Sequence, residues 1–452
     1  MFASSPYRGW AGLYAAMYAC YFLVGMGARI GGWMHDDALV YTQSARRVVD
    51  GSFHLYAILR NPEIAPPLGA TYAYSSYMTI LIAPFVGLAD ALKLGTPWAM
   101  RLIAIPLLAG DILAMQQLRQ LARSLRPKVD ERFMFVGVVL SLFVTSFWLV
   151  TAYKSHIEGT VLLFVLLALR FLPRNLLLSG VFAGLALSAK HMTAILTLIP
   201  VAAVLLFASR ENRLTRRELG GLIDLLRWSG AMLVVFALFL LPPVLSDPSA
   251  SYYALVTQAG RVVDLGPGLT HWTLLWMSQN LPPGTDASLR PLVLQYSSLL
   301  LVAVVALASV GAAWRARTRG QAITLTDARL LGLVAFGAVA YLVLAKWVSD
   351  GYYQFPLALI FLWDLVRRAP LAEGDSTSVL QSFPWVGVGA GVLYRCINLL
   401  DPGALSSRAM TNAAWYMDPL LLVLFLVIAG LLLRHVMYYA GVPRETRARA
   451  AP

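Results

Sequence analysis

The sequence is poor in charged residues. Only 13% of its 452 residues are Asp, Glu, Lys or Arg, whereas 59% are hydrophobic. Because soluble domains carry about 25% charged residues, this composition excludes an ordinary soluble protein. Cysteine is also scarce, and the two cysteines, Cys20 and Cys396, lie in or beside apolar stretches. They do not indicate a disulfide framework. The chain is therefore expected to be a polytopic membrane protein.

The sequence also lacks the short motifs that mark several classes of soluble enzyme. It contains no phosphate-binding P-loop, no glycine-rich dinucleotide-binding pattern and no Gly-x-Ser-x-Gly. No set of His and Cys residues has the spacing of a zinc site. Two adjacent carboxylates could hold a divalent cation, but we do not favour this. We expect neither a metal nor an organic cofactor.

Acidic residues are outnumbered by basic residues, 23 to 36, which leaves a net charge of +13. The basic residues fall in short loops between apolar stretches, a distribution typical of cytoplasmic loops. We therefore attribute the positive charge to membrane topology and expect no nucleic-acid partner. The basic clusters are residues 119–132, 210–227, 315–329, 367–368 and 434–449.

Apolar segments are abundant. A helix needs about 20 mainly apolar residues to cross a bilayer. We expect the apolar segments to form an all-α bundle of about 12 to 13 helices, in a single transmembrane domain over residues 1–452. The first has no small-residue cleavage site and is expected to be a transmembrane helix, not a signal peptide. The segments are residues 10–30, 71–89, 98–118, 133–153, 159–172, 176–189, 192–208, 229–245, 291–314, 330–345, 355–366, 385–400 and 420–433.

The basic clusters constrain which segments cross. If all of them crossed from an inner N-terminus, every basic loop after the third segment would lie outside, against the charge rule. Residues 71–89, which contain Pro84, are therefore expected to be interfacial or re-entrant. All basic clusters, including the tail at residues 441–452, then face the cytoplasm, and the outer loops include residues 31–70 and 246–290. The alternative is that residues 71–89 cross and the N-terminus lies outside, which would put residues 31–70 in the cytoplasm.

The outer loops are also expected to contain short helices. In residues 246–290, Trp272 and Trp276 are one helical turn apart, and Trp favours the headgroup level of a bilayer. The pattern predicts a short interfacial helix, or else a loop that covers the end of the bundle.

Two adjacent acids follow the first apolar segment, in the sequence His35-Asp36-Asp37. They could be solvated loop charges, or carboxylates favoured by the dipole of a helix that begins near Ala38. Other ionisable residues fall on the same expected face. A charge near hydrocarbon is costly unless it is paired or has a function. The presence of several ionisable residues on one face therefore favours a reaction centre. These residues are Lys154, His156, Glu158, Lys190, His191, Arg261, His271, Lys346 and Asp350.

Acids beside cations suit the transfer of a sugar from a lipid phosphate. A carboxylate can take the proton of an attacking hydroxyl, and cations can stabilise the leaving phosphate. Lys154 and Lys346 could instead extend to the membrane interface, and His156 and His271 could instead be structural. The expected donor-phosphate ligands are Lys190, His191, Lys154 and Lys346. The expected substrate-binding residues are His35, Tyr41, His156, His271, Arg261 and Tyr352.

One set of motifs resembles a known family. It comprises Asp37-x-x-x-Tyr41, Ala45-Arg46-Arg47, Asp50-Gly51, Tyr56, Pro66-Pro67-Leu68, Pro84, Gly180-x-x-x-Gly184, Lys190 and Pro200. Over residues 10–200 these motifs resemble the GT-C glycosyltransferases, and most of all the polyprenyl-phosphate-mannose-dependent α-mannosyltransferases of the mycobacterial inositol-mannoside type. The chain departs from the family pattern at Ile64-Ala65, where the family often has an aromatic residue before Pro-Pro.

The resemblance implies an inverting glycosyltransferase of the plasma (inner) membrane, with its active site on the extracytoplasmic face. Asp37 would be the general base, and Asp36 would orient Asp37 or the acceptor. The donor would be a polyprenyl-phosphate sugar, with mannose favoured, and the acceptor a lipid or glycan of the cell envelope. Membrane lipids are the other expected partners.

Two other functional classes stay open. A transporter or lipid flippase could use the acidic pair as an ion or proton relay. Asp111, the clearest acid within an apolar segment, fits either such a relay or a buried hydrogen bond between helices. The third class is a non-catalytic assembly subunit.

Overall fold

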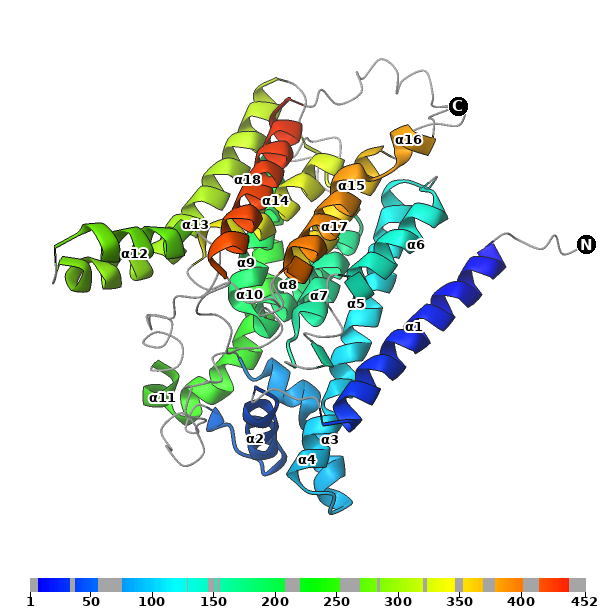
Figure 1. The fold of residues 1–452 in the computed structure, drawn as a ribbon, viewed down its shortest axis with the longest axis vertical. Coiled ribbons are helices and arrows are strands. Elements are labelled where there is room, and N and C mark those ends of the chain that lie inside the picture. The colour runs from blue at the N-terminus through cyan, green and yellow to red at the C-terminus, as the bar shows by residue number, and fades with distance from the viewer. Residues whose placement is uncertain are drawn as a thin grey trace, which may run out of the picture.

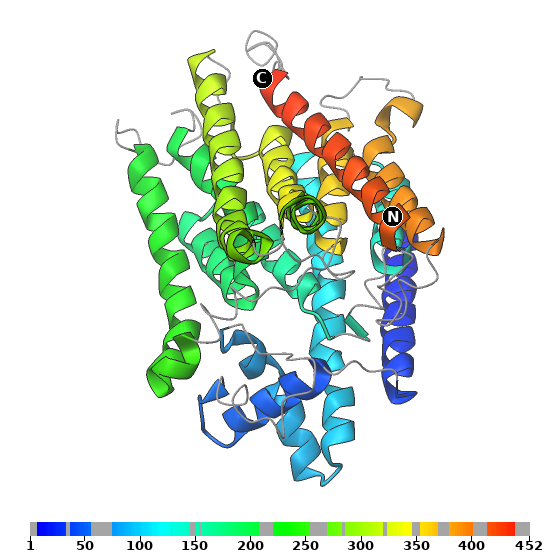
Figure 2. The same ribbon diagram turned by 60° about the vertical axis from the view of Figure 1, so that its left-hand side comes forward.

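The structure, a computed structural model, describes residues 7–32, 37–55, 75–127, 129–144, 151–152, 155–207, 220–252, 269–282, 285–319, 323–345, 353–368, 379–400 and 414–438. Within these ranges the regular structure is entirely helical (Figures 1 and 2). The expectation of an all-α polytopic fold is therefore confirmed.

The helices follow the apolar segments closely. Two of them, α8 and α17, have the same bounds as the predicted segments, whereas the segment expected over residues 98–118 is divided at Ile103. The helices are α1 (Tyr7–Ile30), α2 (Asp37–Val49), α3 (Tyr77–Ala91), α4 (Thr96–Leu102), α5 (Ala104–Leu125), α6 (Glu131–Val139), the π-helix η2 (Leu140–Val144), α7 (Glu158–Phe171), α8 (Leu176–Ala189), α9 (His191–Phe207), α10 (Gly220–Ser246), α11 (Pro248–Tyr252), α12 (Leu269–Asn280), α13 (Thr285–Thr318), α14 (Ala328–Leu344), α15 (Gln354–Arg368), α16 (Val379–Ser382), α17 (Trp385–Leu400) and α18 (Ala414–Tyr438).

Short helices occur in both long loops that are expected to face outward, as predicted. The first loop contains α2, and the loop over residues 246–290 contains α11 and α12. Figure 1 shows α12 extending away from the rest of the bundle beside α13. On this helix Trp276 is exposed, which fits a side chain at the headgroup level.

In the part of the chain that the structure describes, five helical stretches are long and apolar enough to cross a membrane, and the chain is therefore a membrane protein. They are Gly9–Ile30, Thr96–Leu125, Gly221–Ser246, Tyr296–Thr318 and Leu420–Met437. By comparison, α3 has 15 residues, or about 22 Å at 1.5 Å per residue, against a hydrocarbon core of about 30 Å. This length fits a helix that does not cross. Because α8 is equally short, with 14 residues, the placement of residues 71–89 stays a prediction.

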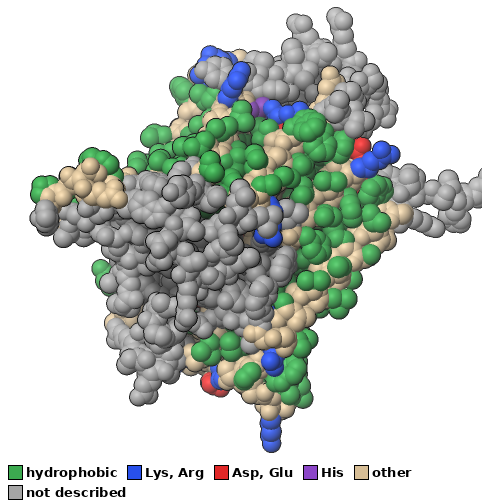
Figure 3. Space-filling view, in the orientation of Figure 1, with side chains coloured by type: hydrophobic (Ala, Val, Ile, Leu, Met, Phe, Trp, Pro, Cys, Tyr) green, Lys and Arg blue, Asp and Glu red, His purple; other side chains and the backbone are tan. Residues whose placement is uncertain are grey.

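The outer surface of the long helices is apolar. Leu23 on α1, Leu238 on α10 and Leu307 on α13 are 68%, 64% and 74% exposed. Figure 3 shows hydrophobic side chains spread along the described part of this face. A soluble protein rarely exposes large contiguous apolar patches, so lipid tails are the natural cover for these helices.

Glycines allow α8 and α10 to approach closely. A Cβ atom at Gly184 would lie 2.5 Å from the carbonyl oxygen of Met232, and one at Gly180 would overlap the carbonyl oxygen of Trp228. Small residues four apart are a common helix-packing device in membranes. The Gly180-x-x-x-Gly184 motif, used above as a family feature, therefore has a direct structural role.

The arginine-bearing ends of α13 and α18 lie at one end of the bundle. Arg315 and Arg317 are in the last turn of α13, and Arg434 lies near the end of α18. Figures 1 and 2 show these two helix ends on the side of the bundle away from α2 and α4. The described helices thus separate the arginines of α13 and α18 from the helix that begins at Asp37. The assignment of the arginine-bearing end to the cytoplasm stays a prediction.

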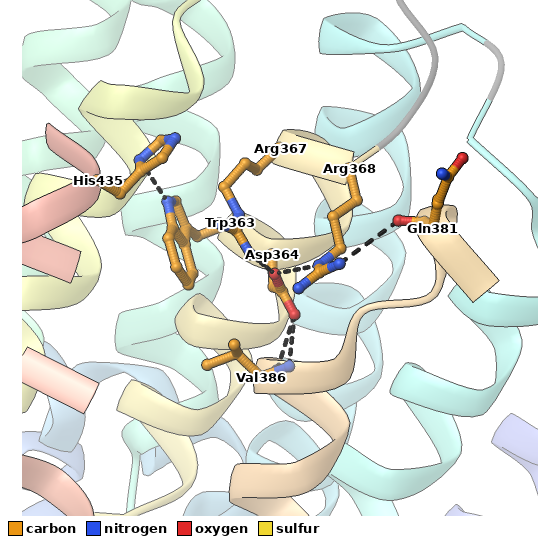
Figure 4. Close-up of polar contacts among 8 residues, drawn as sticks. Trp363, Asp364, Arg367, Arg368, Gln381, Val386 and His435 are labelled. Atoms are coloured by element: carbon orange, nitrogen blue, oxygen red, sulfur yellow. Dashed lines mark hydrogen bonds and ion pairs between the residues drawn. The ribbon is translucent and has the colours of Figure 1, made fainter. Parts of the chain in front are cut away.

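One buried carboxylate joins α15 to α17. Oδ1 of Asp364 accepts hydrogen bonds from Arg367 (2.7 Å) and Arg368 (2.9 Å), and its Oδ2 accepts from the backbone N–H groups of Val386 (2.7 Å) and Gly387 (3.2 Å) (Figure 4). The N–H groups at the start of a helix have no partner within that helix. Asp364 therefore caps α17 from a neighbouring helix, and we assign it a structural role.

Candidate functional site

Five of the predicted site residues have described side chains: Asp37, Tyr41, His156, Lys190 and His191. His271 lies on α12. The other predicted site residues fall outside the described residues. They are His35, Asp36, Lys154, Arg261, Lys346 and Tyr352.

Asp37 is the first residue of α2. A carboxylate is favoured at this position because the helix dipole places positive potential at the N-terminus. Its side chain keeps a quarter of its surface exposed. Tyr41 lies one turn later on the same face of α2 and is buried. The helix thus presents the carboxylate at its end and packs the tyrosine into the protein.

The short segment before α7 brings an imidazole to Asp37. Ser155 has a φ of +58°, in the left-handed region that residues other than glycine rarely adopt. The next residue, His156, places Nε2 3.5 Å from Oδ2 of Asp37 and Nδ1 3.5 Å from Oε1 of Glu158. The imidazole therefore lies between two carboxylates that are more than 100 residues apart in sequence.

Lys190 completes this cluster. It is an extended residue between two helices: its N–H donates to the carbonyl of Ala186 at 3.0 Å, and its carbonyl accepts from Ala194 at 3.1 Å. This break between α8 and α9 directs the side chain into the protein, where Nζ donates to Oε1 of Glu158. Lys190 and Glu158 are 6% and 1% exposed. We call Asp37, His156, Glu158 and Lys190 the charged cluster.

The pKa values of the cluster reflect its alternating charges. Burial raises the pKa of Glu158, but Lys190 and His156 lower it by a larger amount. The resulting pKa of Glu158 is about 2. Burial lowers the pKa of His156, but Glu158 and Asp37 raise it more, so it lies above the ordinary 6.5. The cluster thus holds an ionised glutamate beside a lysine and a histidine that protonates readily.

His191 differs from its neighbour Lys190. It is the first residue of α9 and is half-buried. Burial and the charge of Lys190 both lower its pKa. A neutral imidazole can still donate one N–H, but it brings no positive charge to a phosphate.

A second polar contact lies beneath the charged cluster. The hydroxyl of Tyr21 on α1 donates to Oδ2 of Asp111 on α5 at 2.5 Å. Gly159 on α7 packs directly against Asp111, because a Cβ atom at Gly159 would overlap the carboxyl group. The contact joins three helices and fits the structural interpretation of Asp111.

Two residues of this region were not assigned site roles from the sequence. Glu158 was placed on the expected face but was given no role, although it links His156 to Lys190. Arg29 has no distinguishing signal in the sequence, because an arginine at the end of an apolar helix ordinarily extends to the interface. In the structure Arg29 is completely buried, and its NH2 group donates to Oγ of Ser155.

Among the described residues, no group of three or more His, Cys, Asp or Glu side chains is arranged to hold a metal ion. Comparison of the chain with protein-family models and with curated proteins gives no match in either case.

Proposed function

We propose that the chain is an inverting GT-C-type glycosyltransferase of the inner membrane. It moves a hexose, with mannose favoured, from a polyprenyl-phosphate sugar to a lipid or glycan acceptor on the extracytoplasmic face. The observation that carries the proposal is the contact between Asp37 and His156, with Glu158 and Lys190 behind them.

The cluster supports this reaction because it joins a partly exposed carboxylate to a buried support. Asp37 keeps surface on which an acceptor hydroxyl can approach, whereas Glu158 and Lys190 are enclosed. His156 holds Asp37 from one side and is itself held by Glu158. A base that is fixed in this way needs little reorganisation when it takes a proton.

In the proposed step, the acceptor oxygen attacks the anomeric carbon of the donor sugar. Asp37 takes the hydroxyl proton, and the bond between the anomeric carbon and the phosphate oxygen breaks. Its electron pair leaves with the polyprenyl phosphate. His156 is a positioning residue for Asp37, and Asp36, which lies outside the described residues, would orient Asp37 or the acceptor.

Lys190 is expected from the sequence to bind the donor phosphate, but in the structure it is paired with Glu158. Much of the charge of its ammonium group is thus balanced before any phosphate binds. We therefore propose that Lys190 chiefly fixes Glu158 and His156, and that it contacts the donor phosphate only in addition.

The test is transfer by purified protein from a panel of polyprenyl-phosphate sugars, with mass spectrometry of the products. Asp37→Asn should lower the rate by about 10²–10⁴-fold, the usual contribution of a general base, while the loss of its charge at the start of α2 should cost only about 0.3–1 kcal/mol of stability. Asp130→Asn is the control, because Asp130 caps α6 through its side chain and asparagine caps equally well. Full activity of Asp37→Asn would refute the role of Asp37.

A further inference from the structure

Arg29 is a buried cation with an incomplete set of partners. The guanidinium has no exposed surface, and one of its nitrogens, NH2, donates to Oγ of Ser155. Its Nε and NH1 atoms are buried without a hydrogen-bond partner. In the part of the chain that the structure describes, no acid lies within ion-pair distance of Arg29.

Burial of a guanidinium without an acidic partner costs free energy at the end of a transmembrane helix. An arginine has five N–H donors, and a buried charge is ordinarily paired with an acid. The buried cation Lys190 follows that rule through Glu158. Ionisable residues in membrane segments that break it are candidates for function.

The position of Arg29 indicates that its function is connected with the charged cluster. Its partner Ser155 immediately precedes His156, which contacts Asp37 at 3.5 Å. Arg29 therefore lies next to the charged cluster, on the side of α1. Across these five side chains, the positive charges of Arg29, Lys190 and protonated His156 exceed the charges of Asp37 and Glu158 by one. The unpartnered Nε and NH1 atoms of Arg29 leave donors for an anion at this position.

We propose that Arg29 is the principal ligand of a phosphate group, and that this phosphate is the one that links sugar and polyprenol in the donor. The inference rests on the proposed function. A guanidinium is suited to phosphate because its planar donors match the phosphate oxygens. As the sugar departs, negative charge grows on the phosphate, and a buried cation stabilises that charge more strongly than a solvated one.

The experiment measures binding without transfer. The full-length protein in lipid nanodiscs is titrated with undecaprenyl phosphate, with undecaprenol and with inorganic phosphate, and both affinity and melting temperature are recorded. Because Arg29 is completely covered, access requires a local opening, and samples are equilibrated before each measurement. We expect undecaprenyl phosphate to bind more tightly than undecaprenol. An equal response to inorganic phosphate that depends on Arg29 would support the anion site and assign it to a soluble phosphate.

Two neutral variants test the residue. Arg29→Met removes the charge, and Arg29→Gln also removes it but keeps a donor for Ser155. Each should weaken binding of undecaprenyl phosphate by about 10- to 100-fold, the range expected for a lost hydrogen bond to a charged group. Neither should lower the melting temperature of the unliganded protein, because no acid is left without its partner. Arg123→Met is the matched control; Arg123 pairs with Glu131 and should not affect binding.

Wild-type affinity in either folded neutral variant would overturn the inference. Failure of both variants to fold would also overturn it, since that result would give the guanidinium a structural role. The outcome is separate from that of the proposed function. Loss of lipid-phosphate binding in Arg29→Met, together with full transfer by Asp37→Asn, would retain the phosphate site and reject the base.

Discussion

The pair formed by Lys190 and Glu158 makes a quantitative prediction. Both side chains are buried, and His156 lies 3.5 Å from Glu158 beside the pair. Removing one member of such a pair leaves an uncompensated buried charge, which costs about 3–5 kcal/mol. We therefore expect Lys190→Met and Glu158→Gln each to destabilise the protein by about this amount.

The double variant Lys190→Met/Glu158→Gln should be much more stable than the sum of the single changes implies. Replacing both members of a buried pair is often nearly neutral, so the coupling energy should be about 3 kcal/mol or more. The measurement is reversible unfolding in mixed detergent micelles. The pair formed by Arg46 and Asp90 serves as control, because these side chains are 31% and 34% exposed. Its coupling energy should be about 1 kcal/mol or less.

Additive effects of Lys190→Met and Glu158→Gln would refute the reasoning, because they would show that the two side chains do not share a stabilising contact. The same variants separate structure from chemistry. If the double variant regains both stability and transfer, neither charge is needed for transfer, and the proposed support of His156 by Glu158 is wrong. If it regains stability alone, the pair acts on transfer, through His156 or by contact with the substrate.

Three further predictions concern packing, capping and pH. Gly184→Leu should separate α8 from α10 and prevent stable folding, because the new side chain meets the Met232 carbonyl; a monodisperse purified variant would contradict this. Asp364→Ala should cost about 3–5 kcal/mol, since two arginines lose a buried partner, and Asp364→Asn should cost less; equal melting temperatures of all three proteins would argue against the cap. The raised pKa of His156 means that its stabilising charge is fully present below pH 6.5 and is lost as the pH rises through the higher folded-state value. The melting temperature should therefore fall above pH 6.5 in the wild type, and His156→Gln should lack that slope.

The helices of this protein are largely predictable from sequence because a bilayer requires long apolar segments. The predicted bounds of α8 and α17 match those of the structure. The start of α2 at Asp37 agrees with a helix expected near Ala38. The division between α4 and α5 at Ile103, in contrast, has no signal in hydropathy alone, and the backbone of Ile103 stays in the α-helical region.

The contacts of the candidate site are less accessible to sequence analysis. His156 could be assigned to the same face as Asp37, but its position between two acids depends on how α2 and α7 pack. The partner of Lys190 lies 32 residues away, and the partner of Arg29 lies 126 residues away. A single sequence does not report such distances. The burial of Arg29 cannot be predicted from the sequence either, because an arginine at a helix end has the same sequence context whether it extends to the interface or turns inward.

The contact between Tyr21 and Asp111 bears on the alternative of an ion or proton relay. A relay needs polar groups that continue from one side of the membrane to the other. Gly159, the residue after Glu158, packs against Asp111, and Asp111 accepts from the Tyr21 hydroxyl. Beyond that hydroxyl, the Tyr21 ring packs edge-on against Phe143, with ring centroids 5.8 Å apart, and an aromatic ring carries no exchangeable proton. Among the described residues, the other polar neighbour of Tyr21 and Asp111 is Thr151, which is also buried, whereas Asp37 is the most exposed member of the series. An exposed end at Asp37 is suited to chemistry there, which supports the proposal of transfer over transport.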